Sequence, residues 1–149
     1  MQIINYTLPQ NNPNMSFKAL QISSKAREEV AYMGRVVKDD YEKMWNSLAE
    51  RIADTKFYDV VINHKLRPVF VEKATGIELR NVRLRSQSLD TIGLSADICN
   101  KNVRKTDSYF FIPKPENFII RTKENKLIED CNDVFKVVRA LESYKSLAV

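Results

Sequence analysis

The sequence offers few side chains for nucleophilic or acid–base chemistry, because it contains one histidine, His64, and two cysteines, Cys99 and Cys131. A single histidine excludes any catalytic or zinc site that needs two histidines from one chain. We expect His64 at a strand end with one ring nitrogen in water, and its alternative role is general acid–base catalysis. Cys131 falls in an apolar stripe with helical spacing, which predicts a small side chain in the core.

Cys99 is the better candidate nucleophile, because basic residues follow it closely. Nearby positive charge lowers the pKa of a thiol and favours the reactive thiolate, whereas the alternative is an inert thiol. The sequence holds no C-x-x-C pair, no glycine-rich phosphate-binding motif and no carboxylate spacing typical of a calcium or glycosidase site. We therefore expect neither a cofactor nor a metal, and an enzyme that uses Cys99 or His64 is a secondary hypothesis.

The clearest functional signal is positive charge in the middle of the chain. The whole sequence has a net charge of +5, and residues 56–126 hold 14 basic and 8 acidic residues, a local net of +6. A basic surface favours acidic partners, whereas its alternative role is to keep the protein dissolved. The basic residues that we predict to bind a partner are Arg80, Arg83, Arg85, Lys101, Arg104 and Lys105.

Aromatic residues follow this basic region directly, namely Tyr109, Phe110, Phe111 and Phe118. Proteins that bind single-stranded nucleic acid place basic grooves beside exposed aromatic side chains, on which the bases stack. Aromatic residues in strands more commonly face a core, however. The pattern alone does not decide which of the four aromatic residues are exposed.

Alternating apolar residues predict the strands that carry the basic region. Three of them form an antiparallel meander over residues 57–62, 69–71 and 77–85, with a bulge near Arg80 and Asn81. Further strands are expected over residues 17–22, 109–112 and 118–120, the last two as a hairpin. Residues 86–107 show no clear period, and we expect either a short helix at residues 94–99 or a functional loop.

Two apolar stripes with steps of three and four residues predict helices. The stripe from Val30 to Ile52 predicts one long helix bent at Gly34 or two helices broken there, since glycine is unfavourable inside a helix. The stripe from Leu127 to Leu141 predicts a C-terminal helix. The order of elements indicates an α+β fold: an antiparallel sheet of about five strands, with an N-terminal helix or helix pair and a C-terminal helix packed on one face.

The composition is typical of one globular domain, with 149 residues, 44% of them hydrophobic and 29% charged. Residues 1–15 contain no charged side chain and are predicted to be a flexible tail, which leaves residues 16–149 as a single α+β domain. No apolar run approaches the ~20 residues that span a bilayer. Neither a signal peptide nor a disulfide framework is indicated, so we expect a cytoplasmic protein without a membrane partner.

Together these features predict a small soluble interaction module that binds an acidic partner, an acidic protein or a nucleic acid, through the basic β region. Three alternatives stay open: a nucleic-acid-binding protein, an adaptor or secreted effector that docks through its N-terminal tail, and a small Cys/His enzyme. Activity as an enzyme is the less favoured hypothesis. The sequence leaves the identity of the partner and the oligomeric state open.

Overall fold

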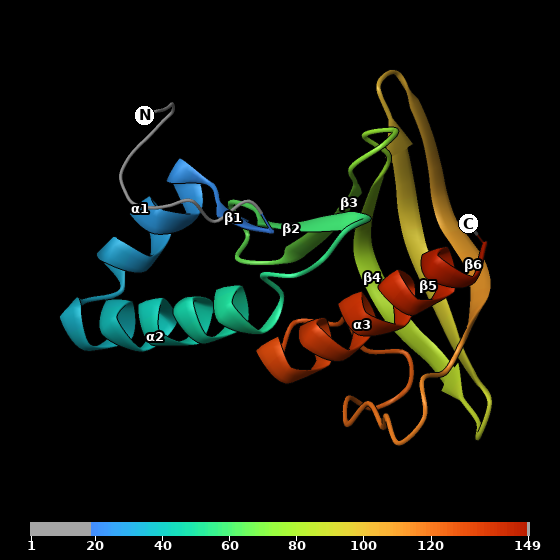
Figure 1. Ribbon diagram of the computed structural model, residues 1–149. Helices are drawn as coiled ribbons and strands as arrows, with labels where there is room; N and C mark the ends of the chain where they lie inside the picture. Colours follow the sequence, from blue (N-terminus) through green and yellow to red (C-terminus); the bar gives the residue numbers. More distant parts are fainter. Residues whose placement is uncertain (1–18, 149) are drawn as a thin grey trace.

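A computed structural model describes residues 19–148, in which a curved sheet is covered by helices (Figure 1). The elements in chain order are β1 (Leu20–Ile22), α1 (Ser24–Tyr32), α2 (Arg35–Arg51), β2 (Tyr58–Ile62), β3 (Pro68–Glu72), β4 (Glu78–Gln87), β5 (Thr91–Asn100), β6 (Val103–Pro113) and α3 (Cys131–Ala148). The predicted α+β class is confirmed. The predicted tail, residues 1–15, lies outside the described residues.

The sheet is mixed and has six strands within the described residues, which corrects the prediction of about five antiparallel strands. The strands lie side by side in chain order, and each neighbouring pair from β2 onward is antiparallel. β1 pairs with β2 in parallel. A parallel pair needs a long crossover connection, and here α1 and α2 provide it.

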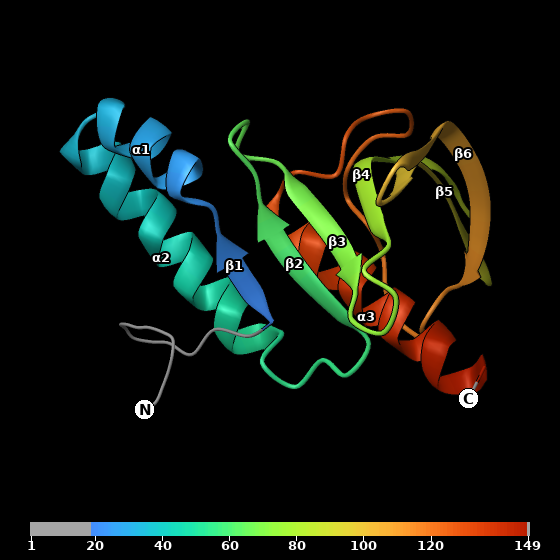
Figure 2. The same cartoon turned by 90° about the horizontal axis from the view of Figure 1, so that it is seen from above.

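The predicted three-stranded meander is confirmed as β2, β3 and β4. However, β3 pairs with β4 through only two residue pairs, Phe70 with Leu79 and Val71 with Glu78. Beyond this point the two halves of the sheet diverge (Figure 2), and residues 125–128 take over as the partner of β4. The N–H of Leu84 donates to the carbonyl of residue 126 at 3.2 Å. β4 therefore changes its partner along its length.

The expectation of a loop or short helix in residues 86–107 was wrong. These residues form the end of β4, all of β5 and the start of β6. In β5 the side chains of Ile92, Leu94 and Ala96 are buried on one face, and Gly93 and Ser95 lie between them. The alternation is real, but a glycine, a serine and a small alanine make it hard to recognise in the sequence.

The predicted strand at residues 118–120 was also wrong, because these residues lie in the connection between β6 and α3. Ile120 is nevertheless buried. Its backbone is held by a side chain, since the amide of Gln87 donates to the carbonyl of Ile120 at 2.8 Å and accepts from its N–H at 3.2 Å. One glutamine thus replaces the strand partner that the apolar pattern suggested.

The N-terminal helical stripe forms two helices, the second of the two predicted arrangements. Ser23 caps α1, with its hydroxyl accepting from the N–H of Ala26 at 3.1 Å. Gly34 separates the helices with a φ of 104°, a conformation that favours glycine. The predicted C-terminal helix is confirmed as α3. None of the helices in residues 19–148 is both long enough and apolar enough to cross a membrane.

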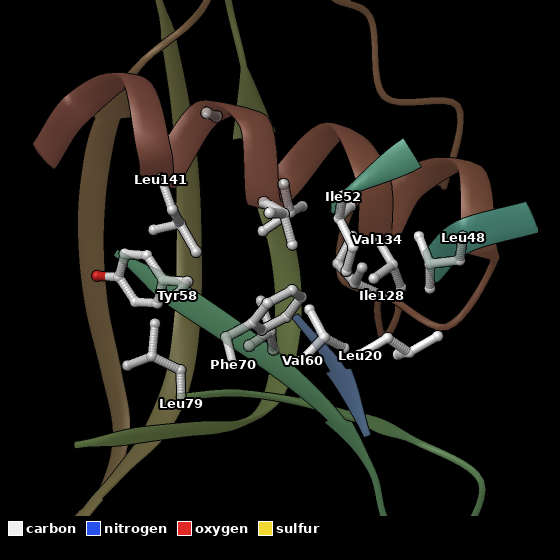
Figure 3. Packing of buried hydrophobic residues seen from close by; sticks show 14 of the residues in the cluster. Leu20, Leu48, Ile52, Tyr58, Val60, Phe70, Leu79, Ile128, Val134 and Leu141 are labelled. Carbon is white, nitrogen blue, oxygen red and sulfur yellow. The ribbon is translucent and has the colours of Figure 1, made fainter. Parts of the chain in front are cut away.

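The core lies between one face of the sheet and the helices α2 and α3 (Figure 3). Tyr58, Val60 and Phe70 of the sheet lie on the side that faces Val134 and Leu141 of α3, and Leu48 extends the core to the end of α2. We call this covered side the inner face of the sheet. The opposite side is the outer face, and over β4, β5 and β6 it carries no helix within the described residues (Figures 1 and 2).

Candidate functional site

Four of the six predicted basic residues share the outer face. Arg80 stands opposite Asp97 in the pairing of β4 with β5, and Arg104 stands opposite Cys99 in the pairing of β5 with β6. Arg83 and Arg85 follow on β4. The predicted bulge is confirmed, since the register shifts between residues 80 and 83. Arg80 and Arg83 are three residues apart and would point to opposite faces of a regular strand. The register shift places both of them on the outer face together with Arg85.

The other two predicted residues are not part of this group. Lys101 lies in the turn between β5 and β6. Lys105 pairs with Ile98, whose side chain packs against the core on the inner face. Because alternate residues of a strand point to opposite faces, Lys105 lies on the other side of the sheet from Arg104.

Much of the positive charge on the outer face is neutralised locally by carboxylates. Arg80 Nε donates to Glu78 Oε1 at 2.7 Å. Arg104 Nη2 lies 3.1 Å from Asp97 Oδ2. The pairing of Arg104 could not be read from the sequence, because its charged partner lies on another strand.

Arg83 and Arg85 are held against the sheet by hydrogen bonds. Arg83 Nη1 donates to the carbonyl oxygen of Asn125 at 2.7 Å, and Arg85 Nη1 donates to its side-chain oxygen at 3.1 Å. Arg85 also donates to Ser95 Oγ at 2.9 Å and to Asp107 Oδ1 at 3.0 Å. Both guanidinium groups are therefore positioned before any ligand arrives.

A hollow of about 510 Å³ opens beside these two arginines. Its charged lining comprises four cations, Lys65, Arg67, Arg83 and Arg85, and two carboxylates, Asp97 and Asp107. Lys65 and Arg67 come from the turn between β2 and β3, and sequence reasoning missed both. Their signal was present as two cations between the predicted strands at residues 57–62 and 69–71, but only the folded sheet brings this connection beside β4.

Asp97 organises this region. Its carboxylate accepts hydrogen bonds from the backbone N–H of Asp107 at 3.0 Å, from Asn81 Nδ2 at 3.0 Å and from Arg104 at 3.1 Å. The N–H of Asp107, followed by the amide of Asn81, holds the pKa of Asp97 below its ordinary value. The charge of Asp97 is therefore largely satisfied by the protein itself.

Two of the four aromatic residues are exposed on the same outer face. Tyr109 is 52% and Phe111 is 60% exposed, and their ring centroids lie 5.1 Å apart. They pair across the strands with Ser95 and Gly93. We call Tyr109 and Phe111 the aromatic pair. Tyr109 therefore stands directly across the strand from Ser95, which binds Arg85.

Gly93 provides the space beneath the aromatic pair. A Cβ atom at this position would lie 3.0 Å from Tyr109 Oη and 3.1 Å from Phe111 Cε1. It would also lie 2.5 Å from Ser86 Oγ. The absence of a side chain thus lets both rings lie close over β5.

The other two aromatic residues belong to the interior. Phe110 pairs with the buried Leu94 and packs against the core. Phe118 is half-buried, and its ring centroid lies 6.4 Å from that of Phe135 in α3. The exposed and buried aromatic residues of β6 thus follow its strand alternation.

The candidate catalytic residues are scattered. His64 is exposed in the turn after β2, and Cys99 is half-buried on β5. Cys131 is half-buried at the first position of α3 and packs against the core, and burial raises the pKa of its thiol. Within residues 19–148 no three His, Cys, Asp or Glu side chains are grouped to hold a metal ion.

The outer face of β4, β5 and β6 thus combines fixed arginines, an exposed aromatic pair and a polar hollow. Arg80, Arg85 and Arg104 are paired with carboxylates, whereas Arg83 donates only from Nη1 to a backbone carbonyl. No protein-family model, no curated protein and no solved structure matches this chain.

Proposed function

We propose that this protein is a small interaction module that binds an acidic partner through the outer face of β4, β5 and β6. Single-stranded nucleic acid is the acidic partner that fits this face best. The observation that carries the proposal is the aromatic pair, Tyr109 and Phe111, exposed on the same face as Arg83 and Arg85. We place this function in the cytoplasm, in keeping with the two free cysteines.

The aromatic pair would stack on bases. Each base has a flat apolar face, and stacking on an aromatic side chain contributes about 1–3 kcal/mol per base with little dependence on sequence. The two rings are tilted by 49° relative to each other. Each ring therefore presents its own surface, and we expect neighbouring bases to stack on separate rings.

The arginines would contact the sugar–phosphate backbone. Arg83 and Arg85 are already fixed by Asn125 and Ser95, so little side-chain entropy is lost when a strand binds. Guanidinium groups suit phosphate oxygens because their N–H groups form a planar fork. This part of the interaction should weaken as the salt concentration rises.

An acidic protein is the second candidate partner. The observation that favours it is the pair of fixed guanidinium groups of Arg83 and Arg85, since a guanidinium binds a carboxylate as well as it binds a phosphate. An acidic peptide would use the arginines without stacking on the aromatic pair. Dependence on Tyr109 and Phe111 therefore distinguishes the two partners.

The test is the affinity for a short unstructured oligothymidylate and for a duplex, measured by fluorescence anisotropy at several salt concentrations. We expect the single strand to bind more tightly than the duplex. Tyr109→Ala and Phe111→Ala should each weaken binding by about 5- to 150-fold, the equivalent of about 1–3 kcal/mol. Tyr32→Ala is the matched control, because Tyr32 is 89% exposed and belongs to α1, which lies at the opposite side of the molecule from β6 (Figure 1).

No binding near physiological salt, about 0.15 M, would contradict nucleic-acid binding. Binding that is insensitive to both aromatic substitutions would contradict the stacking role of the outer face. Loss of binding in the Tyr32 variant as well would indicate a general effect of the substitutions. The tail-docking adaptor and the small enzyme remain predictions from the sequence alone.

A further inference from the structure

We infer that the hollow between the β2–β3 turn and β4 is a phosphate-binding site, in which Lys65, Arg67 and Arg83 hold the phosphate group. The aromatic pair would bind bases, whereas this hollow, which Ser95 of β5 also lines, would bind phosphate. The inference rests on the proposed function in one respect only, namely that the phosphate would belong to the bound single-stranded nucleic acid. The site itself follows from the donors and charges that line the hollow.

The turn that carries Lys65 and Arg67 has a fixed shape. The side-chain oxygen of Asn63 accepts from the N–H of Lys65 at 2.9 Å and from the N–H of Arg67 at 3.1 Å. The N–H of Asn63 donates to the carbonyl of Arg67 at 3.0 Å, and Leu66 adopts a φ of 62°. Both basic residues therefore start from a constrained backbone.

Lys65, Arg67 and Arg83 keep N–H groups that make no hydrogen bond in the described part of the chain, whereas Arg85 donates to three partners. Arg83 donates from Nη1 to Asn125, and its Nε and Nη2 make no hydrogen bond within the described residues. Arg67 Nε lies 3.7 Å from Glu129, which is an ion pair too long to be a hydrogen bond. The ammonium of Lys65 makes no ion pair within residues 19–148.

The acidic residues of the hollow have their charges satisfied by other groups. Asp97 accepts from three donors outside the turn, and Asp107 pairs with Arg85 at 3.0 Å. The lining holds four cations and two carboxylates, which leaves a net of +2. An excess of two positive charges complements a phosphate group, which carries one to two negative charges, about −1.5 to −2 for a monoester.

The hollow is large enough for more than a bare phosphate. Its volume of about 510 Å³ falls within the range of about 300–1,000 Å³ that is typical of small-molecule sites. Either an internal phosphodiester with its sugar or a terminal phosphate monoester fits this description. The shared chemistry is a phosphate oxygen that accepts hydrogen bonds from guanidinium and ammonium groups.

The direct test uses inorganic pyrophosphate as the probe and two-dimensional NMR of the backbone amides as the readout. We expect saturable shifts of the Lys65, Arg67 and Leu127 amides, which lie around the hollow. The double substitution Lys65→Ala/Arg67→Ala should remove this saturation. Lys38→Ala/Lys43→Ala is the matched control, since it removes the same charge from the exposed side of α2.

The second arm uses the oligonucleotide. For a single strand, the slope of log affinity against log salt falls by about 0.7 for every phosphate that the protein no longer neutralises, so the hollow variant should show a shallower slope. Tyr109→Ala should weaken binding without changing the slope. Oligonucleotides with and without a 5′ phosphate distinguish a terminal from an internal phosphate, since only a terminal site gains affinity from the added group.

The outcomes separate this inference from the proposed function. Pyrophosphate shifts that are absent, or that persist in the hollow variant, would overturn the phosphate site even if the oligonucleotide binds. Saturable pyrophosphate binding without any oligonucleotide binding would retain the site and overturn the proposed function. Equal melting temperatures of the variants establish that the loss of binding is not a loss of folding.

Discussion

The two faces of the same strands carry opposite kinds of residues. On β5 the inner face presents Leu94, which is fully buried under the helix layer, and the outer face presents Ser95, which binds Arg85. On β6 the inner Ile112 is buried, whereas the outer Phe111 is 60% exposed. One face of the sheet therefore builds the core, and the other leaves aromatic and polar side chains exposed.

Charged residues also serve different purposes on the two faces. Below α3, the carboxylate of Glu142 accepts hydrogen bonds from the backbone N–H groups of Lys56, Phe57 and Tyr58 at 2.7, 2.8 and 2.8 Å. This carboxylate attaches the helix to the start of β2. On the outer face, Asp97 and Asp107 instead hold arginine side chains in place. Substitutions should therefore affect stability on one face and binding on the other.

The largest difference should come from removing an aromatic ring on each face. Phe70 is fully buried on the inner face, and Phe70→Ala should lower the free energy of unfolding by about 3–5 kcal/mol, because it leaves a cavity. Phe111→Ala on the outer face should change this free energy by about 0.5 kcal/mol or less. Urea unfolding of both variants measures the contrast. Similar losses in the two variants would contradict the division between the faces.

The helix attachment gives the next largest effect. Glu142→Gln keeps the size of the side chain but replaces one acceptor oxygen by a donor, which then faces backbone N–H groups. We expect the free energy of unfolding to fall by about 1–3 kcal/mol. Glu50→Gln, on the exposed side of α2, serves as the control and should be neutral in thermal unfolding. A neutral Glu142 variant would show that α3 docks through apolar contacts alone.

Alkaline pH should destabilise the inner face. Burial, with smaller contributions from the charges of Glu72 and Glu142, raises the pKa of Tyr58 from 10.0 to about 12. The folded state therefore favours the neutral phenol, and its contribution is complete below pH 10 and lost as the pH rises to 12. We expect a loss of about 1–2 kcal/mol between these values. Tyr58→Phe should remove this part of the pH dependence, and an unchanged profile would contradict it.

A smaller effect on stability than that of the inner-face substitutions should come from Gly93→Ala. The added methyl group meets Ser86 Oγ, which can rotate away, and the two rings of the aromatic pair, which must move. We expect a loss of stability of about 1 kcal/mol, together with weaker oligonucleotide binding. Anisotropy and thermal unfolding of one sample measure both. Unchanged binding would show that the position of the rings does not matter for the partner.

The sequence was sufficient to predict elements with a clear period. The meander of β2, β3 and β4 and the bulge beside Arg80 follow from local patterns, and Gly34 marked the place where the helical stripe bends or breaks. β5 was missed, because Gly93 and Ser95 dilute its alternation. Ile120 was predicted to lie in a strand because it is apolar. Its backbone, however, is hydrogen-bonded by the side chain of Gln87 and not by a neighbouring strand.

The candidate site was only partly predictable for a different reason. Strand alternation alone predicts that Arg83 and Arg85 share a face. Their proximity to Lys65 and Arg67 could not be predicted in this way, because it depends on where β3 diverges from β4 and on how the whole sheet curves. The exposure of the aromatic pair, too, depends on which face α3 covers. Such information lies in contacts between distant segments, so no local pattern contains it.

The change of partner along β4 couples the two faces. Asn125 anchors Arg83 and Arg85 on the outer face, and three residues later Ile128 is buried in the core and donates its N–H to Val82 at 2.8 Å. This short segment leads directly into α3. A displacement of this segment would therefore move the anchor of the two arginines and the start of α3 together.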